Sequence, residues 1–202
     1  MTGEEQTRRK RSGRRAGPTS SHDAILEAAR AKFAENGFEG ATMRAIAAAA
    51  DVDSALLHHF FLTKDGLFTA AVRDVFAVPD LVATVVAGDP AGAGERLARA
   101  FLVHWDDPEV RPRVEALIRS VRSFDGAAGT VRDFLAGDVL GPVVAAFGGG
   151  RPDLRASLLG THLLGVVYMR YVLRSEPLAS MEATELAATI GEACQSYLTE
   201  RF

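Results

Sequence analysis

Apolar residues recur every three or four positions along nearly the whole chain from residue 20 onward. Ala and Leu fill most of these positions, and runs of β-branched residues are brief. A spacing of three to four places apolar side chains on one face of an α-helix, whereas strands alternate apolar and polar residues. The pattern therefore predicts an all-α fold without paired strands.

The first predicted helix begins at Ser20 or Ser21 and ends at the Asn36-Gly37 pair. Serine is a favoured N-cap residue, because its hydroxyl accepts a hydrogen bond from the first turn. Glycine takes the left-handed backbone conformation that ends many helices at little cost. A fourth helix of this N-terminal region is predicted to begin after Thr63, which is another capping residue.

Between these two helices the sequence predicts two short helices joined by a tight turn within residues 43–60. Thr42 caps the first short helix and Asp53 caps the second. Asp51 and Val52 form the turn, with Asp51 in a left-handed conformation that Asp tolerates better than most residues. Such a pair is a helix-turn-helix, the arrangement that holds one helix against the base edges of DNA.

Beyond Pro79 the chain predicts a second helical unit with weaker helix boundaries. We expect a short helix between Pro79 and Pro90, one over residues 94–106, one beginning at Pro108 or Pro112, one over residues 130–147 with a kink at Gly141-Pro142, and two long ones over residues 151–174 and 182–199. The predicted organisation is a basic arm over residues 1–19, a DNA-binding domain over residues 20–66, and a second helical domain, which carries the predicted dimer interface, over residues 67–202.

The net charge of −3 hides an asymmetry that matters for nucleic-acid binding. Residues 1–76 carry 11 Lys and Arg against 10 Asp and Glu, and residues 77–202 carry 12 against 16. Six of the N-terminal cations lie within residues 8–15, where no apolar residue is spaced for burial. We expect this arm to be disordered in isolation. It either contacts phosphates or the minor groove, or serves as a solubilising tail.

The order of residues from about 21 to 72 resembles the DNA-binding domain of the tetracycline-repressor (TetR) family. Members show a Phe, a Gly, a Thr-capped helix with Ile-Ala, an Ala-Gly-Val-Ser turn, a Leu-Tyr-x-x-Phe helix and a Ser-Lys-Glu cap. The corresponding residues are Phe33, Gly37, Thr42, Ile46, Ala47, Ala50-Asp51-Val52-Asp53, Leu57-His58-His59-Phe60-Phe61 and Thr63-Lys64-Asp65.

The resemblance implies a set of DNA contacts on the second and third helices. Asp51 and Asp53 depart from the family pattern, in which the turn carries Gly and Ser. His58 replaces a Tyr that contacts phosphate, so we hypothesise stronger DNA binding at lower pH, where imidazole is protonated. The implied DNA-binding residues are Thr42, Arg44, Ser54, Ala55, Leu56, His58, His59 and Lys64.

The second domain carries apolar residues that either line a cavity or fill a solid core. TetR-like regulators bind a small effector between these helices, and His104 and His162 are the polar groups best suited to orient one. The predicted effector pocket comprises Phe101, His104, Trp105, Leu117, Val121, Phe124, His162, Val166 and Met169.

The two C-terminal helices predict a dimer interface. The helix over residues 153–174 is apolar around most of its circumference, so it must be covered on two sides. Packing the pair against a symmetry mate forms a four-helix interface, and a two-fold dimer presents two reading helices to a palindrome. The predicted interface residues are Leu158, Leu163, Tyr168, Tyr171, Leu186, Ile190, Cys194 and Tyr197.

No catalytic or metal-binding motif stands out, so we expect no enzymatic activity, metal or cofactor. The adjacent pair His58-His59 diverges by ~100° on a helix and has no third ligand at a suitable spacing. Asp106-Asp107, which imitates an acid/base pair, is interpreted as a capped helix end.

Three features of the composition bear on the compartment. The single cysteine, Cys194, excludes an internal disulfide and indicates a reducing compartment, expected to be the cytoplasm. The longest apolar stretch, residues 163–173, contains Arg170 and is shorter than the ~20 residues that span a bilayer. No apolar segment follows the N-terminal charges, so neither a membrane helix nor a secretory signal is expected.

Together these observations predict a homodimeric, ligand-responsive transcriptional regulator, most simply a repressor that leaves its palindromic operator when an effector binds. Activation in place of repression fits the same sequence. Two alternatives remain open at this stage. One is a DNA-binding protein without an effector, and the other is a small helical enzyme that uses the C-terminal cavity. The effector, the operator and the regulated genes are not readable from the sequence.

Overall fold

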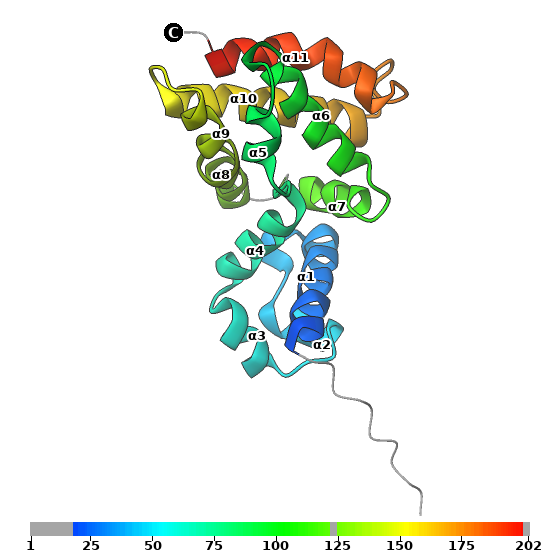
Figure 1. The fold of residues 1–202 in the computed structure, drawn as a ribbon. Coiled ribbons are helices and arrows are strands. Elements are labelled where there is room, and N and C mark those ends of the chain that lie inside the picture. Colours follow the sequence, from blue (N-terminus) through cyan, green and yellow to red (C-terminus); the bar gives the residue numbers. More distant parts are fainter. Residues whose placement is uncertain (1–17, 122–124, 200–202) are drawn as a thin grey trace, which may run out of the picture.

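The computed structural model describes residues 18–121 and 125–199, which form two helical units joined by α4 (Figure 1). The N-terminal unit contains α1 (Pro18–Gly40), α2 (Met43–Ala49), α3 (Ser54–Phe61) and α4 (Lys64–Phe76). Gly37 interrupts α1 with φ 68°, so the predicted end of the first helix is confirmed as a break followed by one further turn. Within the described ranges all regular structure is helical, which confirms the all-α prediction.

Side-chain caps start three of these helices, as predicted. The side-chain oxygens of Thr42, Asp53 and Thr63 each accept a hydrogen bond from a backbone N–H two or three residues later, at 3.1, 2.7 and 3.0 Å. The first helix starts at Pro18, a little before the predicted serines. Proline suits a first helical turn, because that turn has no intrahelical acceptor for its N–H.

The N-terminal unit closes around a small aromatic core. The rings of Phe33, Phe38 and Phe68 lie 5.1 to 5.7 Å apart and join α1 to α4. Ile46 on α2 and Leu57 on α3 are fully buried. Each short helix is therefore held by an apolar face, and the opposite face is left toward solvent.

The C-terminal unit contains seven α-helices in the described residues. α11 and α6 lie at the end of the molecule farthest from α2 and α3 (Figure 1). No helix in the described part of the chain combines the length and apolarity needed to cross a membrane. The helices are α5 (Leu81–Val86), α6 (Ala93–Asp106), α7 (Arg111–Val121), α8 (Asp125–Asp133), α9 (Gly141–Ala146), α10 (Pro152–Val167) and α11 (Ala183–Thr199), with a 3₁₀ turn η1 (Pro90–Gly92) and π-helical segments η2 (Phe134–Leu140) and η3 (Tyr168–Val172).

The π-helical segments correct two sequence predictions. Residues 130–147 were expected to form one helix with a kink, whereas the structure divides them among α8, η2 and α9. Pro142 lacks an N–H and crowds the preceding turn, and the wider π turn relieves this conflict. The predicted helix over residues 151–174 likewise ends as α10 at Val167 and continues as η3. α7 begins at Arg111, which leaves Pro112 in its first turn.

α6 and α11 cross at a very short distance. A Cβ atom on Gly94 would lie 2.2 Å from the carbonyl oxygen of Gly191, and one on Gly191 would lie 2.9 Å from the Cα of Glu95. The Gly94 N–H donates to the side-chain oxygen of Gln195 at 2.7 Å. Only glycine permits this contact between the two backbones.

Two buried arginines hold the ends of the C-terminal helices. Arg155, which is 1% exposed, donates to the carbonyls of Tyr197, Leu198 and Gly148. These bonds satisfy carbonyls at the end of α11 that have no partner within the helix. The guanidinium of Arg170 likewise fixes the connection between η3 and α11, because it donates to two carbonyls there and to a carboxylate on α6.

Candidate nucleic-acid interface

The turn between α2 and α3 has the predicted geometry. Asp51 has φ 53°, in the left-handed region, and its N–H donates to the carbonyl of Ala48 at 3.3 Å. The N–H of Val52 donates to the carbonyl of Ala47 at 3.0 Å, and the Val52 side chain is half-buried against the core. The two helices are therefore locked at a fixed angle by backbone bonds and one apolar plug.

α3 presents one face to the core and the other to solvent. Leu57 and Phe61 anchor the helix in the core. Among the predicted DNA-binding residues, Ala55, His58 and His59 are exposed, while Ser54 and Leu56 are half-buried. α3 lies with α2 at the end of the molecule opposite α11 (Figure 1). This exposed helix face is thus held on a rigid base at one end of the protein.

Thr42 and Arg44 lie at the start of α2, and both are exposed. The Thr42 hydroxyl accepts the capping bond from Ala45, so its acceptor capacity is partly used within the protein. The Arg44 guanidinium has no hydrogen-bond or ion-pair partner among the described residues. Its five N–H donors are consequently available to an external acceptor such as a base edge or a phosphate.

The Lys64 ammonium, predicted to bind phosphate, donates instead to three backbone carbonyls at the end of α1. Its Nζ lies 2.9 Å from the oxygen of Phe38, 3.3 Å from that of Ala41 and 3.4 Å from that of Glu39. It also lies 4.5 Å from the centre of the Phe38 ring. In this structure Lys64 ties α4 to the end of α1, and a phosphate contact stays a prediction.

Sequence reasoning missed Leu62, which joins α3 to the cap of α4. Its φ and ψ are 59° and −55°, and the Thr63 N–H donates to the Phe61 carbonyl at 2.6 Å. These values describe a strained γ-turn, a conformation that is rare for a residue with a side chain. The side chain is 77% exposed. The sequence did contain one indication of this turn. Only one residue separates Phe61, at the end of α3, from Thr63, the cap of α4, so that residue must reverse the chain.

The Leu62 carbonyl also fixes the ring of His58. It lies 3.1 Å from the His58 Nδ1. A carbonyl oxygen only accepts hydrogen bonds, so Nδ1 is the ring nitrogen that donates. His58 therefore has its Nε2 left for a partner outside the protein.

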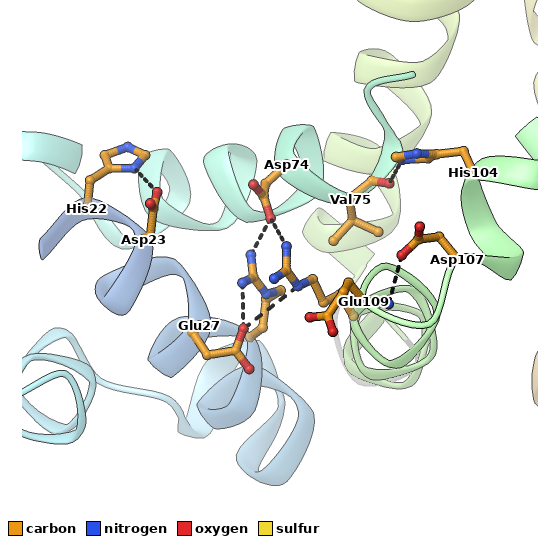
Figure 2. Close-up of polar contacts among 10 residues, drawn as sticks. His22, Asp23, Glu27, Asp74, Val75, His104, Asp107 and Glu109 are labelled. Atoms are coloured by element: carbon orange, nitrogen blue, oxygen red, sulfur yellow. Dashed lines mark hydrogen bonds and ion pairs between the residues drawn. The ribbon is translucent and has the colours of Figure 1, made fainter. Parts of the chain in front are cut away.

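His22, near the start of α1, is a second residue that the sequence did not single out. Its ring centre lies 5.1 Å from that of Phe61 and 5.7 Å from that of Phe60, so α1 supports α3 from beneath. Its Nδ1 is 3.6 Å from a carboxylate oxygen of Asp23 (Figure 2). The contact joins residues almost forty positions apart, and no local pattern in the sequence marks it.

The residues of the predicted effector pocket fall into two groups in the structure, one buried in the core and one on α10 and η3. Phe101, Trp105 and Leu117 are at most 1% exposed, and the first two rings lie 4.9 Å apart in the core. The His104 Nε2 donates to the carbonyl of Val75 on α4 at 3.3 Å (Figure 2). His162, Val166 and Met169 lie on α10 and η3 and are half-buried or exposed. The side chain of Val121 and the whole of Phe124 lie outside the described residues.

The predicted interface residues divide in the same way. Leu158, Tyr168 and Tyr197 are only half-buried. The others are buried within the protomer, with exposed fractions of 9% or less: Leu163, Tyr171, Leu186, Ile190 and Cys194.

Two buried members of this set have other roles in the protomer. Burial raises the pKa of Tyr171, whose hydroxyl donates to the carboxylate of Asp106 at 3.0 Å. Burial also raises the pKa of Cys194 to about 12.

Asp106 pairs with Arg170 at 2.8 Å, and the Asp107 carboxylate accepts the N–H of Glu109 at 2.8 Å. Asp107 thus caps the turn after α6, in agreement with the interpretation from the sequence, whereas Asp106 joins α6 to η3.

Accessible and mostly apolar residues recur at helical spacing along α10 and η3. We define the α10 face as Leu158, His162, Val166, Met169 and Leu173, which recur every three or four residues. Met169 is 36% exposed and Leu173 is 55% exposed. Burial lowers the pKa of His162, whose Nε2 is buried without a partner among the described residues. Its ring also contacts that of Tyr197 on α11, with centres 6.2 Å apart.

A groove of about 630 Å³ borders the end of α4, and no pattern in the sequence marks it. Apolar side chains of α5 and η2 line it, and the ion pair between Arg73 and Asp138 lies across it at 2.6 Å. No group of three or more His, Cys, Asp or Glu side chains in the described ranges is arranged to hold a metal ion. The lining residues are Arg73, Ala77, Val78, Asp80, Leu81, Val82, Ala83, Phe134, Asp138 and Val139.

Comparison with family models gives two matches that together cover both helical units. Residues 25–71 match the model described as bacterial regulatory proteins, tetR family. Residues 91–198 match the model described as the tetracyclin repressor-like C-terminal domain. The first match contains the whole helix-turn-helix, and the second runs from the start of α6 almost to the end of α11.

Individual relatives match over different lengths of the chain. The HTH-type transcriptional repressor AcnR of Corynebacterium glutamicum is 44% identical over 57 residues, and AcnR of Corynebacterium efficiens is 42% identical over 57 residues. Each alignment covers 28% of this chain and 30% of the repressor, so it spans less than a third of those curated relatives. A crystal structure of a TetR-family regulator from Streptomyces coelicolor is 38% identical, with 93% of this chain and 99% of that chain covered and a TM-score of 0.71.

Proposed function

The chain belongs to the TetR family of transcriptional regulators, and from this premise we propose that it is a repressor that binds a palindromic operator as a homodimer. A small-molecule effector releases it from the operator. The observation that carries the proposal is the exposed face of α3, held on a capped and buried base beside the unpaired guanidinium of Arg44. The AcnR proteins are transcriptional repressors that resemble this chain over its DNA-binding unit, and this resemblance supports the same direction of regulation.

Operator binding is tested by a gel shift on the DNA beside the protein's own gene, or on DNA selected from a random library. Arg44→Ala is expected to weaken specific binding about tenfold or more, because a good base contact contributes ~1–3 kcal/mol. Arg132→Ala serves as the matched control, since Arg132 is exposed on α8 and pairs with its neighbour Asp133. A wild-type chain that prefers no DNA sequence would refute the proposal.

Dimerisation is supported by the α10 face. It is largely apolar, it is only partly covered within the protomer, and it runs from the middle of α10 to the end of η3. A helix that is apolar on an uncovered side is stabilised when another apolar surface covers it. A second copy of the chain supplies the same strip by two-fold symmetry.

Effector binding is supported by the groove at the end of α4. The groove borders the helix that continues from the helix-turn-helix, so its occupation bears directly on the position of α4. An effector can release DNA only if it binds the DNA-free arrangement more tightly than the DNA-bound one. The test is a metabolite screen that measures both thermal stabilisation and loss of the gel shift. A compound that does both supports the proposal, and a screen without stabilising compounds favours a regulator that has no effector.

A further inference from the structure

The last turn of α4 contacts both helical units through three consecutive residues. Arg73 pairs with Asp138 on η2 and the Val75 backbone carbonyl accepts from His104 on α6, so these two contacts reach the C-terminal unit. Asp74 accepts from Arg30 on α1, within the N-terminal unit. Successive helical side chains diverge by about 100°, so those of Arg73 and Asp74 reach different elements. Any change in the orientation of α4 must therefore alter several of these contacts together.

Asp74 belongs to a charged group that we define as the junction cluster: Glu27, Arg30, Asp74 and Arg113. Figure 2 shows Glu27 and Asp74 facing the same pair of guanidinium groups. Arg30 is 5% exposed and pairs with Asp74 at 2.5 Å and with Glu27 at 2.7 Å. Its hydrogen bond lowers the pKa of Glu27, so this carboxylate is held in the charged form. These three residues all belong to the N-terminal unit.

Arg113 is the member contributed by the C-terminal unit. It lies on α7, and its guanidinium is 3.8 Å from Asp74 and 3.9 Å from Glu27. α7 packs along α1 at this level, so the cluster lies where the two units meet. If the side chain of Arg113 is shortened, both carboxylates keep their closer bonds to Arg30. Loss of Arg113 thus removes a link between the two units, while the ion pairs of Arg30 with Glu27 and Asp74 remain within the N-terminal unit.

We propose that Arg113 is a positioning residue that fixes the orientation of the DNA-binding unit on α7 and thereby selects the spacing between operator half-sites. The inference rests on the proposed function. His22, which contacts the rings of α3, lies eight residues before Arg30, or roughly 12 Å along α1. If the DNA-binding unit tilts by about 10° about the cluster, α3 moves by about 2 Å. Such a movement in both subunits changes the distance between the two α3 helices by about one base-pair step of ~3.4 Å.

The experiment measures binding to a series of palindromes that differ only in the number of base pairs between half-sites. The wild-type chain and Arg113→Met are compared as full-length proteins, because methionine keeps much of the apolar stem without the charge. The readout is the ratio of dissociation constants between the best spacing and spacings one base pair longer or shorter. Phosphate contacts are common to all members of the series, so their contribution cancels in this ratio.

Arg113→Met is expected to lower the spacing preference about threefold, in line with partly exposed ion pairs. Arg113→Lys is expected to restore most of it, because the positive charge returns. Arg132→Met removes one exposed positive charge elsewhere and should leave the preference unchanged. Thermal unfolding of Arg113→Met should stay close to that of the wild type, since the closer pairs remain.

The outcomes separate the inference from the proposed function. A wild-type chain with no specific operator overturns both. Specific binding by the wild type, with an identical spacing preference in Arg113→Met, overturns the inference alone. Uniform weakening at every spacing also overturns it, because a general loss of charge would produce that result. Spin labels attached through Ala55→Cys add a test without DNA, because they report the distance between the two subunits. The distribution of distances should be broader when Arg113→Met is also present, and an equally narrow distribution would contradict the proposal.

Discussion

At the scale of single residues, Leu62 combines a costly backbone with an exposed apolar side chain. Its positive φ suits glycine, and strain of this kind costs ~1–3 kcal/mol for other residues. Leu62→Gly is therefore expected to raise the free energy of unfolding by about 1 kcal/mol, after allowance for the flexibility that glycine adds to the unfolded chain. The measurement is urea unfolding followed by circular dichroism.

Val103→Gly is the control for this prediction, because Val103 is also an exposed apolar residue but lies within the regular helix α6 and outside the α10 face. Glycine gives no conformational advantage there and should lower stability slightly. If the two substitutions changed stability by the same amount, the strain attributed to Leu62 would be wrong.

His58 gives the second prediction at this scale, which concerns pH. The neutral ring donates from Nδ1 to the Leu62 carbonyl, so its Nε2 carries no proton for a phosphate. A proton on Nε2 would give the ring a donor and a positive charge for a phosphate, so we hypothesise tighter operator binding at lower pH. The change is measured as the dissociation constant at several pH values and constant ionic strength. His58→Gln should flatten the dependence, whereas equal slopes in both proteins would exclude His58 as its cause.

The sequence predicted residues whose role is local and missed those whose role is distant. Thr42, Asp53 and Thr63 cap helices two or three residues away, and the pattern around each was sufficient. Lys64 and His22 act across more than twenty residues, and the sequence does not show which carbonyl or ring lies beside them. Lys64 was accordingly predicted as a phosphate ligand from the family motif, whereas the structure places its ammonium on α1.

At the scale of elements, the crossing of α6 and α11 gives a prediction about packing. Gly94→Ala should destabilise the fold by about 2–3 kcal/mol, because the added Cβ meets backbone atoms of α11 that cannot move independently. Gly137→Ala is the control, since a Cβ there meets no atom within 4 Å. Alanine at that position should be neutral or slightly stabilising. Thermal unfolding of both variants checks the prediction, and equal melting temperatures would contradict the close contact.

Element boundaries were predicted well where caps occur and poorly where the helical turn widens. α2, α3 and α4 begin at their capping residues as expected. η2 and η3 were missed, because a π turn has no side-chain signature and depends on how neighbouring helices pack. Pro142 marked the disturbance but not its form.

At the scale of the whole molecule, the dimer interface proposed on the α10 face gives a prediction about assembly. Met169→Asp should give a monomer by analytical ultracentrifugation, because a charge would be buried between two apolar strips. Operator affinity should then fall by ~100-fold or more, since one reading helix replaces two linked ones. Val103→Asp is the control, as Val103 is 53% exposed on α6 and lies outside the α10 face. A dimeric Met169→Asp protein would place the interface elsewhere.

A change of sequence pattern at Pro79 indicated a second set of helices, but the way the two helical units meet was not predictable. The domain boundary predicted between residues 66 and 67 falls within α4, and it stays a prediction. The junction cluster joins Glu27, Arg30, Asp74 and Arg113, which look like ordinary exposed charges when each is seen in its own helix. Similarly, the accessible strip on α10 could not be distinguished from its buried side, because both are apolar and only packing against η2, α9 and α11 decides between them.

The burial of Cys194 gives the protein an internal reporter of its own opening. This cysteine is the only one in the sequence, it is fully buried on α11, and its thiol stays protonated at neutral pH. A thiol reagent reacts with the thiolate, so labelling must proceed through molecules in which α11 has separated from its neighbours. The labelling rate thus records how often the C-terminal unit opens, without any engineered probe.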